Sequence, residues 1–148
     1  MKRLLPTLVV LLSVASASRA ADLSGPADVL DGETLKVEGA TLHLAGIAAP
    51  PLDQWCLRNG REIPCGVIAR GALLDLVTGS EVFCRLTGTT FRDLPDAVCS
   101  AGGFEVNANM IYTGWALPLP GAGHERTRDG AREDRRGLWA TSYVRDPL

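Results

Sequence analysis

Four cysteines, Cys56, Cys65, Cys84 and Cys99, restrict the fold of this 148-residue chain more than any other feature. Their number is even, and in an exported chain an even set predicts two disulfides, each stabilising the fold by roughly 2–4 kcal/mol through restriction of the unfolded chain. Three connectivities are possible, and we favour the sequence-local one, which joins Cys56 to Cys65 and Cys84 to Cys99. A four-cysteine metal site is the alternative, but there is no Cys-x-x-Cys pair and the spacings do not fit a zinc ribbon.

The N-terminus predicts the export on which this interpretation depends. Residues 1–20 have the three parts of a secretory signal peptide: Lys2 and Arg3 at the start, an apolar run over 4–14, and small residues leading to cleavage after Ala20. The alternative is an uncleaved membrane anchor, but the apolar run is shorter than the ~20 residues that span a bilayer. We therefore expect an exported protein, periplasmic or secreted, with no stable membrane insertion after cleavage.

The mature part, residues 21–148, has the size of one domain and an acidic balance. The whole chain has 15 Lys and Arg against 17 Asp and Glu; the leader removes three of the basic residues and none of the acidic ones, which leaves 12 against 17 and a net charge near −5. Proteins that bind long stretches of phosphate backbone are usually basic. The charge therefore argues against non-specific binding of nucleic acid.

An arginine-rich segment near the C-terminus, residues 125–136, is the exception to this acidic balance. Acidic residues alternate with its five arginines, so we interpret it as a solvated helix with i,i+4 ion pairs rather than a nucleic-acid patch. Trp139 follows the glycine that ends this helix and is predicted to pack in the core, as is Trp115 after an earlier helix.

Hydrophobic periodicity predicts a mixed α+β domain that is mostly β. Apolar alternation gives three strands within 21–47, a loop over 48–64, a helix from Cys65 to Gly79, strands over 81–86 and 96–100 around a polar loop, and two further helices near 106–114 and 125–136. Three strands, a helix, two strands and then helices are the arrangement of a five-stranded OB-fold Greek-key barrel with three helices.

Short segments spread over the mature chain carry a family resemblance. They are Val29-Leu-Asp-Gly-Glu-Thr-Leu-Lys-Val37, Leu42-His-Leu-Ala-Gly-Ile-Ala-Ala-Pro50, Gln54-Trp-Cys56 with Pro64-Cys-Gly66, Gly114-Trp-Ala116 and Gly137-Leu-Trp139. In this order and spacing the chain resembles the staphylococcal-nuclease-like (thermonuclease) family, in particular a secreted bacterial branch with four cysteines. The resemblance implies the same OB barrel and a calcium-dependent cleavage of DNA and RNA phosphodiesters.

The catalytic positions of that family are mostly replaced here. Glu33 stands where the family has an aspartate that helps to bind calcium. The two arginine positions fall on His43 and Leu94, the second calcium-binding aspartate on Ala48 and the general-base glutamate on Pro51. Alanine and proline cannot ligate calcium or accept a proton, and loss of one preorganised charge alone costs ~10²–10³ in rate. We expect an inactive nuclease site, with His43 as a half-exposed strand residue.

Five other residues are the remaining candidates for a site. Asp31 and Glu33 could hold a weak cation, although an Asp-Gly-Glu sequence is also ordinary turn chemistry. Trp55 could stack on a ligand or pack against a Cys56–Cys65 bridge, so both roles stay open. Phe91 with Arg92 could hold a base and a phosphate.

Three classes of function are compatible with these residues. We place first an exported thermonuclease-like domain that is catalytically inactive and acts as a binding or interaction module, because a fold does not fix a function. The alternatives are an active calcium-dependent nuclease with a rebuilt site and an extracytoplasmic structural protein. We expect no cofactor, calcium entering only if the family site is partly functional. The partner would be a protein or a short single-stranded nucleic acid.

Overall fold

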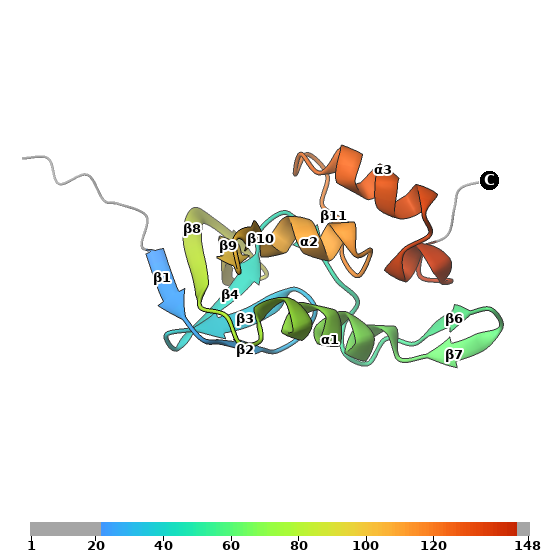
Figure 1. Ribbon diagram of the computed structural model, residues 1–148, viewed down its shortest axis with the longest axis horizontal. Helices are drawn as coiled ribbons and strands as arrows, with labels where there is room; N and C mark the ends of the chain where they lie inside the picture. Colours follow the sequence, from blue (N-terminus) through green and yellow to red (C-terminus); the bar gives the residue numbers. More distant parts are fainter. Residues whose placement is uncertain (1–21, 145–148) are drawn as a thin grey trace, which may run out of the picture.

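The fold is a mixed α+β domain, mostly strands, in a computed structural model that describes residues 22–144 (Figure 1). The predicted signal peptide, residues 1–20, lies outside the described residues. Among these, three α-helices and a short 3₁₀ helix accompany the strands: α1 (Cys65–Val77), α2 (Val106–Tyr112), α3 (Glu125–Glu133) and η1 (Gly137–Ala140). The strands are β1 (Asp22–Gly25), β2 (Ala27–Val29), β3 (Thr34–Val37), β4 (Ala40–Leu44), β5 (Ile47–Ala48), β6 (Cys56–Arg58), β7 (Arg61–Ile63), β8 (Val82–Phe91), β9 (Leu94–Ala101), β10 (Phe104–Glu105) and β11 (Leu117–Pro118).

The main sheet runs in the order β1-β8-β9-β4-β3-β2, with β10 paired to β9. Its neighbours are antiparallel except β4 and β9, which run parallel at the centre. The hydrogen-bonded path begins at β1 and ends at β2, so the sheet is not closed, and the OB barrel stays a prediction. Figure 1 shows α1 and α2 next to each other beside the strands, where the two helices contact one another, and the β6–β7 hairpin extending away from them.

The core forms where the alternating apolar residues of the strands meet the helices. Its largest fully buried apolar side chains come from β3, β4, β5, β8, α1 and α2. Burying each of them contributes roughly 1.5–3 kcal/mol to stability. These are Leu35, Val37, Leu42, Leu44, Ile47, Leu73, Val82, Val106, Met110 and Ile111. The period-2 pattern of the sequence therefore predicts the buried faces of β3 and β4 correctly. In α1 the apolar pattern is only partly buried, because Val67 and Leu74 are exposed.

Both predicted disulfides are present. Cys84 and Cys99 face each other across β8 and β9, and Cys56 of β6 is joined to Cys65 at the start of α1. Two disulfides in a domain of this size are typical of an oxidising, extracytoplasmic compartment. Within residues 22–144, no helix has both the length and the hydropathy needed to cross a bilayer.

Two segments predicted as loops contain strands instead. In 48–64 the chain forms the β6–β7 hairpin around Asn59-Gly60, whose positive φ angles of 51° and 75° are those that favour Asn-Gly in a tight hairpin turn. In 88–95 strand β8 continues past a bulge to Phe91, and β9 already begins at Leu94. Threonines in that stretch are polar but β-branched, which suits a strand, so polarity alone misassigned it.

Two of the segments that carry the family resemblance begin with glycines that contact each other in the fold. Gly114 ends the α2 turn at φ 79° and Gly137 begins η1 at φ 53°, and the Leu138 N–H donates to the Gly114 carbonyl at 2.8 Å. A Cβ on Gly114 would lie 2.2 Å from the Arg136 carbonyl oxygen, and one on Gly137 would lie 2.5 Å from Gly114. Only glycine at both positions lets the last described segment dock against α2.

Candidate functional site

His43 lies at the centre of a polar cluster on the sheet face where the family resemblance puts its chemistry. It faces Thr34 of β3 on one side and Asp96 of β9 on the other. Its Nδ1 is 2.6 Å from the Asp96 carboxylate, whose second oxygen accepts a hydrogen bond from Thr89 at 2.8 Å. An ionised carboxylate can only accept, so Nδ1 is the donor in this contact. Nε2 is buried without a hydrogen-bond partner in the described chain.

The prediction that His43 is half-exposed is wrong, because only 1% of the residue is accessible to solvent. Strands pair with β4 on both sides of it, and the Phe91 ring stacks on the imidazole with the centroids 4.2 Å apart and the planes 20° from parallel. Phe91 reaches this position because β8 and β9 extend as one long hairpin, which the sequence analysis ended too early.

At the tip of this hairpin the Phe91 and Arg92 side chains contact each other. The Arg92 guanidinium lies 4.8 Å from the centre of the Phe91 ring. Arg92 and Asp93 form the turn with φ angles of 47° and 66°, a left-handed conformation that non-glycine residues seldom adopt. The turn thereby directs the Arg92 side chain, 73% exposed, toward Glu33 at 3.5 Å.

Glu33 is buried and held by the protein itself. One carboxylate oxygen accepts the Ala49 N–H at 2.6 Å, and the other faces Arg92. The Asp31 carboxylate accepts the Glu33 backbone N–H at 2.9 Å, the geometry of an Asx turn. We refer below to Glu33, His43, Phe91, Arg92 and Asp96 together as the His43 cluster.

These residues do not fit the calcium ion that the family resemblance implies. Calcium requires six to eight oxygen ligands, whereas the Glu33 oxygens are already bonded and an arginine cation lies beside them. Among residues 22–144 no group of three or more His, Cys, Asp or Glu side chains is arranged to hold a metal. We therefore derive no metal-dependent step for this site.

At the other three positions where the family's catalytic residues are replaced, the chain makes strand pairings or packing contacts. Ala48 belongs to β5 and pairs with Leu117 of β11, and Leu94 opens β9 opposite Phe91. The Pro51 carbonyl accepts the Gln54 N–H at 2.9 Å and packs so closely on α1 that a Cβ on Gly66 would clash with it. None of the three side chains can bind a cation or transfer a proton.

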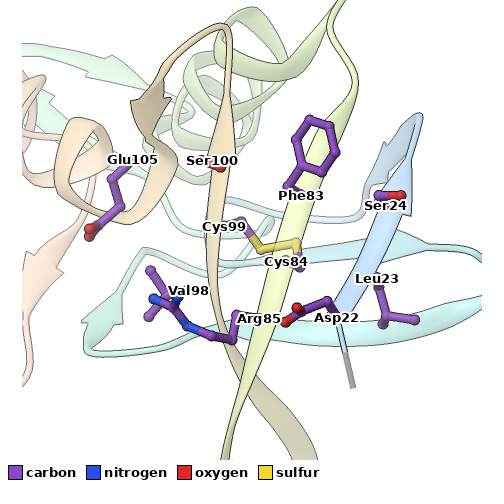
Figure 2. Close-up of a pocket in the computed structure, with 10 residues that line it drawn as sticks. All are labelled: Asp22, Leu23, Ser24, Phe83, Cys84, Arg85, Val98, Cys99, Ser100 and Glu105. Carbon is purple, nitrogen blue, oxygen red and sulfur yellow. A yellow bond between two sulfur atoms is a disulfide. The ribbon is translucent and has the colours of Figure 1, made fainter. Parts of the chain in front are cut away.

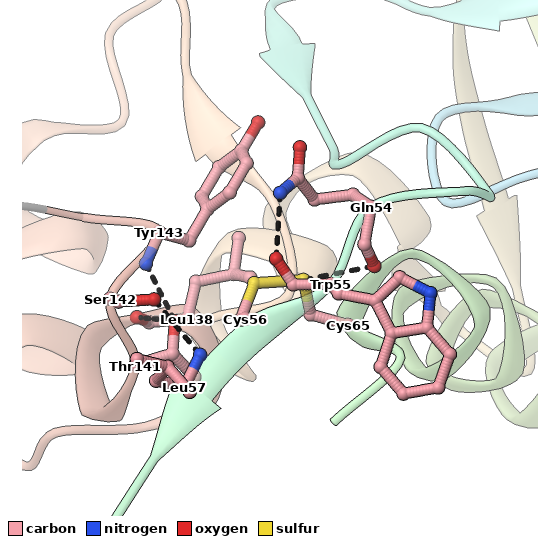
Figure 3. Close-up of a disulfide and its surroundings, with 9 residues drawn as sticks. All are labelled: Gln54, Trp55, Cys56, Leu57, Cys65, Leu138, Thr141, Ser142 and Tyr143. Carbon is pink, nitrogen blue, oxygen red and sulfur yellow. Dashed lines mark hydrogen bonds between the residues drawn. A yellow bond between two sulfur atoms is a disulfide. The ribbon is translucent and has the colours of Figure 1, made fainter. Parts of the chain in front are cut away.

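Two aromatic residues lie beside the Cys56–Cys65 disulfide (Figure 3). Trp55 is 59% exposed and does not belong to the buried cluster around this disulfide, whereas Tyr143 packs against that cluster. Burial, followed by the negative charge of Glu33, raises the pKa of Tyr143, and the positive charge of Arg92 opposes the increase. Tyr143 is therefore electrostatically linked to the His43 cluster, and no local sequence motif identified it.

A separate groove of about 400 Å³ lies over the Cys84–Cys99 disulfide (Figure 2). Its walls come from β1, β8, β9 and Glu105, and combine the half-exposed Phe83 ring with charges of both signs, Asp22 and Arg85 among them. Apart from the two disulfide cysteines, none of the predicted site residues lines it. No sequence motif indicates this groove.

Comparison with known proteins gives a distant similarity. No model of a known protein family matches the chain. The chain is similar to the succinoglycan biosynthesis protein ExoI of Rhizobium meliloti (strain 1021), with 29% identity over 146 aligned residues. The alignment covers 91% of this chain and 66% of ExoI, so the chain spans just under two thirds of the length of that relative.

Proposed function

We propose that this chain is an exported, thermonuclease-like OB-fold domain that has lost nuclease chemistry and acts as a binding module. The supporting observation is that the polar side chains of the His43 cluster are bonded to one another. His43 donates to Asp96 beneath the Phe91 ring, and Glu33 is held by the Ala49 N–H and by Arg92. The Glu33 oxygens are already bonded, and His43 Nε2, although without a partner among residues 22–144, is buried, so neither group can position an attacking water.

The same arrangement leaves a binding surface at the rim of the cluster. Arg92 is exposed and its guanidinium lies over the Phe91 ring, a combination suited to a phosphate or to a protein partner, and Trp55 is a second exposed aromatic side chain, beside the Cys56–Cys65 disulfide. Tyr143 adds a phenol near Glu33 and Arg92. The rim rather than the buried cluster is the contact surface in this proposal.

The first test is a nuclease assay of the oxidised mature protein with calcium, on DNA and on RNA. A second protein carries His43→Arg, Ala48→Asp, Pro51→Glu and Leu94→Arg, which restores the family residues. We expect no cleavage by the parent. Chelator-sensitive cleavage by the parent would overturn the proposal and favour the active nuclease.

The second test measures binding of a short single-stranded oligonucleotide at several salt concentrations. We expect Arg92→Ala to weaken binding and Arg61→Ala, which removes the same charge from the exposed β7 strand, to leave it unchanged. A nucleic-acid ligand gives an affinity that falls steeply with salt. If no oligonucleotide binds, a protein partner becomes the favoured ligand.

A second candidate function follows from the similarity to ExoI, which is named for succinoglycan biosynthesis. The alignment covers nearly the whole chain, so a role beside exopolysaccharide synthesis is testable for this protein as well. Titration of the mature protein with succinoglycan oligosaccharides, with Trp55→Ala as the variant, distinguishes this candidate. Saccharide binding that is lost in the variant would support it.

A further inference from the structure

A small cavity lies between α3 and η1, far along the chain from the His43 cluster. Arg132, Arg135, Trp139, Thr141 and Val144 line it, and its volume is about 180 Å³. We call these five residues the cationic corner. Two of the five are arginines in a protein whose mature part is acidic overall. The positive charge of this lining therefore contrasts with the net negative charge of the mature protein.

The backbone at Arg135 has an unusual conformation. Helix α3 ends in a Schellman motif, in which the Arg135 N–H donates to the Arg132 carbonyl and the Arg136 N–H to the Ala131 carbonyl. The residue at the Arg135 position of this motif is left-handed, with φ 51° here, and is usually glycine. An arginine is retained where a glycine would fit the backbone better, and its side chain lines the cavity.

Trp139 supplies a second, independent observation. It is only partly buried, contrary to the core position predicted for it, and its indole N–H is enclosed without a hydrogen-bond partner in residues 22–144. The Arg132 guanidinium lies 5.9 Å from the centre of its ring. A buried N–H without an acceptor is unfavourable, and a ligand oxygen beside Trp139 would remove that cost.

One acidic residue of α3 and one that follows it pair with arginines that do not line the cavity, at sequence separations of one and two rather than the expected i,i+4 spacing. Asp129 pairs with the adjacent Arg128 at 2.8 Å, and Asp134 pairs with Arg136 at 3.6 Å. Within the described part of the chain, the Arg135 guanidinium makes no ion pair or hydrogen bond. Its charge therefore remains available to a ligand.

We infer that the cationic corner is a binding site for a small oxyanion, a phosphate or a carboxylate group. The Arg135 guanidinium supplies charge-assisted hydrogen bonds, and the Trp139 N–H, which has no acceptor among residues 22–144, supplies a directed donor. A cavity of this size holds a single oxyanion group rather than a polymer backbone. The site is independent of the function proposed for the His43 cluster.

The test follows the indole N–H signals of the oxidised mature protein by ¹H–¹⁵N NMR during titration. One arm uses inorganic phosphate and the other sodium acetate, both at constant ionic strength set with chloride. The chain has three tryptophans, so Trp139→Phe assigns the relevant signal. We expect a saturable shift of that signal. Saturation in the phosphate arm alone identifies a phosphate site, and saturation in the acetate arm alone a carboxylate site.

Arg135→Gly is the decisive variant, because glycine keeps the left-handed backbone and removes only the side chain. We expect it to weaken binding at least about tenfold, the effect of losing a charged hydrogen bond. Arg126→Ala, an equal change of charge at an exposed position of α3, should leave the affinity unchanged. The inference is overturned if neither anion gives a saturable Trp139 shift, or if Arg135→Gly binds as tightly as the parent.

Discussion

The His43 cluster and the cationic corner place polar side chains in opposite situations. In the cluster, charged groups contact each other: His43 is bonded to Asp96, Arg92 faces Glu33, and an aromatic ring covers the imidazole. In the corner, Arg135 has no described partner and the Trp139 N–H has no acceptor. The first arrangement stabilises a fold, and the second leaves interactions for a ligand to complete.

This difference shows that a position that matches a catalytic residue of a family need not lie in a functional site. The family resemblance directs attention to the His43 cluster, where side chains have been replaced and the remaining polar groups bond mostly to each other, with His43 Nε2 as the exception among residues 22–144. Unsatisfied donors and left-handed non-glycine residues are instead signs of a conformation kept for another reason. Both regions have such a residue, Arg92 in one and Arg135 in the other. Measurements of stability can separate their roles.

The largest expected effect comes from the disulfides, since each one supports one of the two regions. Cys84–Cys99 closes a 15-residue separation within the hairpin that carries Phe91, and Cys56–Cys65 closes 9 residues beside Leu138 and Tyr143. Chain entropy predicts a loss of about 3 kcal/mol for Cys84→Ala with Cys99→Ala, and a slightly smaller loss for the other pair. Urea unfolding measures both. A larger loss from the shorter loop would contradict the ranking.

Breaking the His43–Asp96 contact should have the next largest effect. Asp96→Ala removes the acceptor of a histidine that is 1% exposed, so we expect unfolding to become easier by about 1–3 kcal/mol. Asp96→Asn keeps an acceptor and should cost less. Asp28→Ala, an equal charge change on an exposed position of β2, is the control and should stay within about 0.5 kcal/mol of the parent. An Asp96→Ala protein as stable as that control would show that the cluster is not a structural unit.

Arg135→Gly should stabilise the protein, whereas the variants above destabilise it. Left-handed geometry costs a non-glycine residue roughly 1–2 kcal/mol, and glycine avoids that cost, although its flexible unfolded chain offsets part of the gain. We therefore expect a net stabilisation of up to about 1 kcal/mol in urea unfolding, together with the loss of anion binding described above. A destabilised Arg135→Gly protein would indicate that the Arg135 side chain stabilises the cationic corner.

The sequence predicts much of this molecule because local patterns decide it. Alternation identifies the buried faces of β3 and β4, Gly79 ends α1 at φ 75°, and the cysteine spacing gives both disulfides. The site is less predictable, because the burial of His43 depends on Phe91, 48 positions later, arriving over it. Tyr143 near Glu33 is a contact of the same long-range kind. Periodicity carries no information about such contacts.

The smallest expected effect tests whether Tyr143 belongs to the His43 cluster at all. Burial and then Glu33 raise its pKa above the usual value, so the folded protein retains the phenol proton at a pH where the unfolded chain loses it. This contribution to stability is fully present below about pH 10, the unfolded pKa, and is lost as the pH rises through the folded pKa.

Ultraviolet titration of the phenolate in a Tyr112→Phe background reports Tyr143 alone, because the chain has two tyrosines. Glu33→Gln should lower the Tyr143 pKa by removing a negative charge, and Arg92→Ala should raise it further by removing a positive one. Glu62→Gln on the exposed β7 strand is the matched control and should leave the pKa unchanged. If Glu33→Gln and Glu62→Gln gave the same titration curve, the hairpin tip and the C-terminal aromatic would have to be treated as separate surfaces, and Tyr143 would leave the binding rim proposed for this protein.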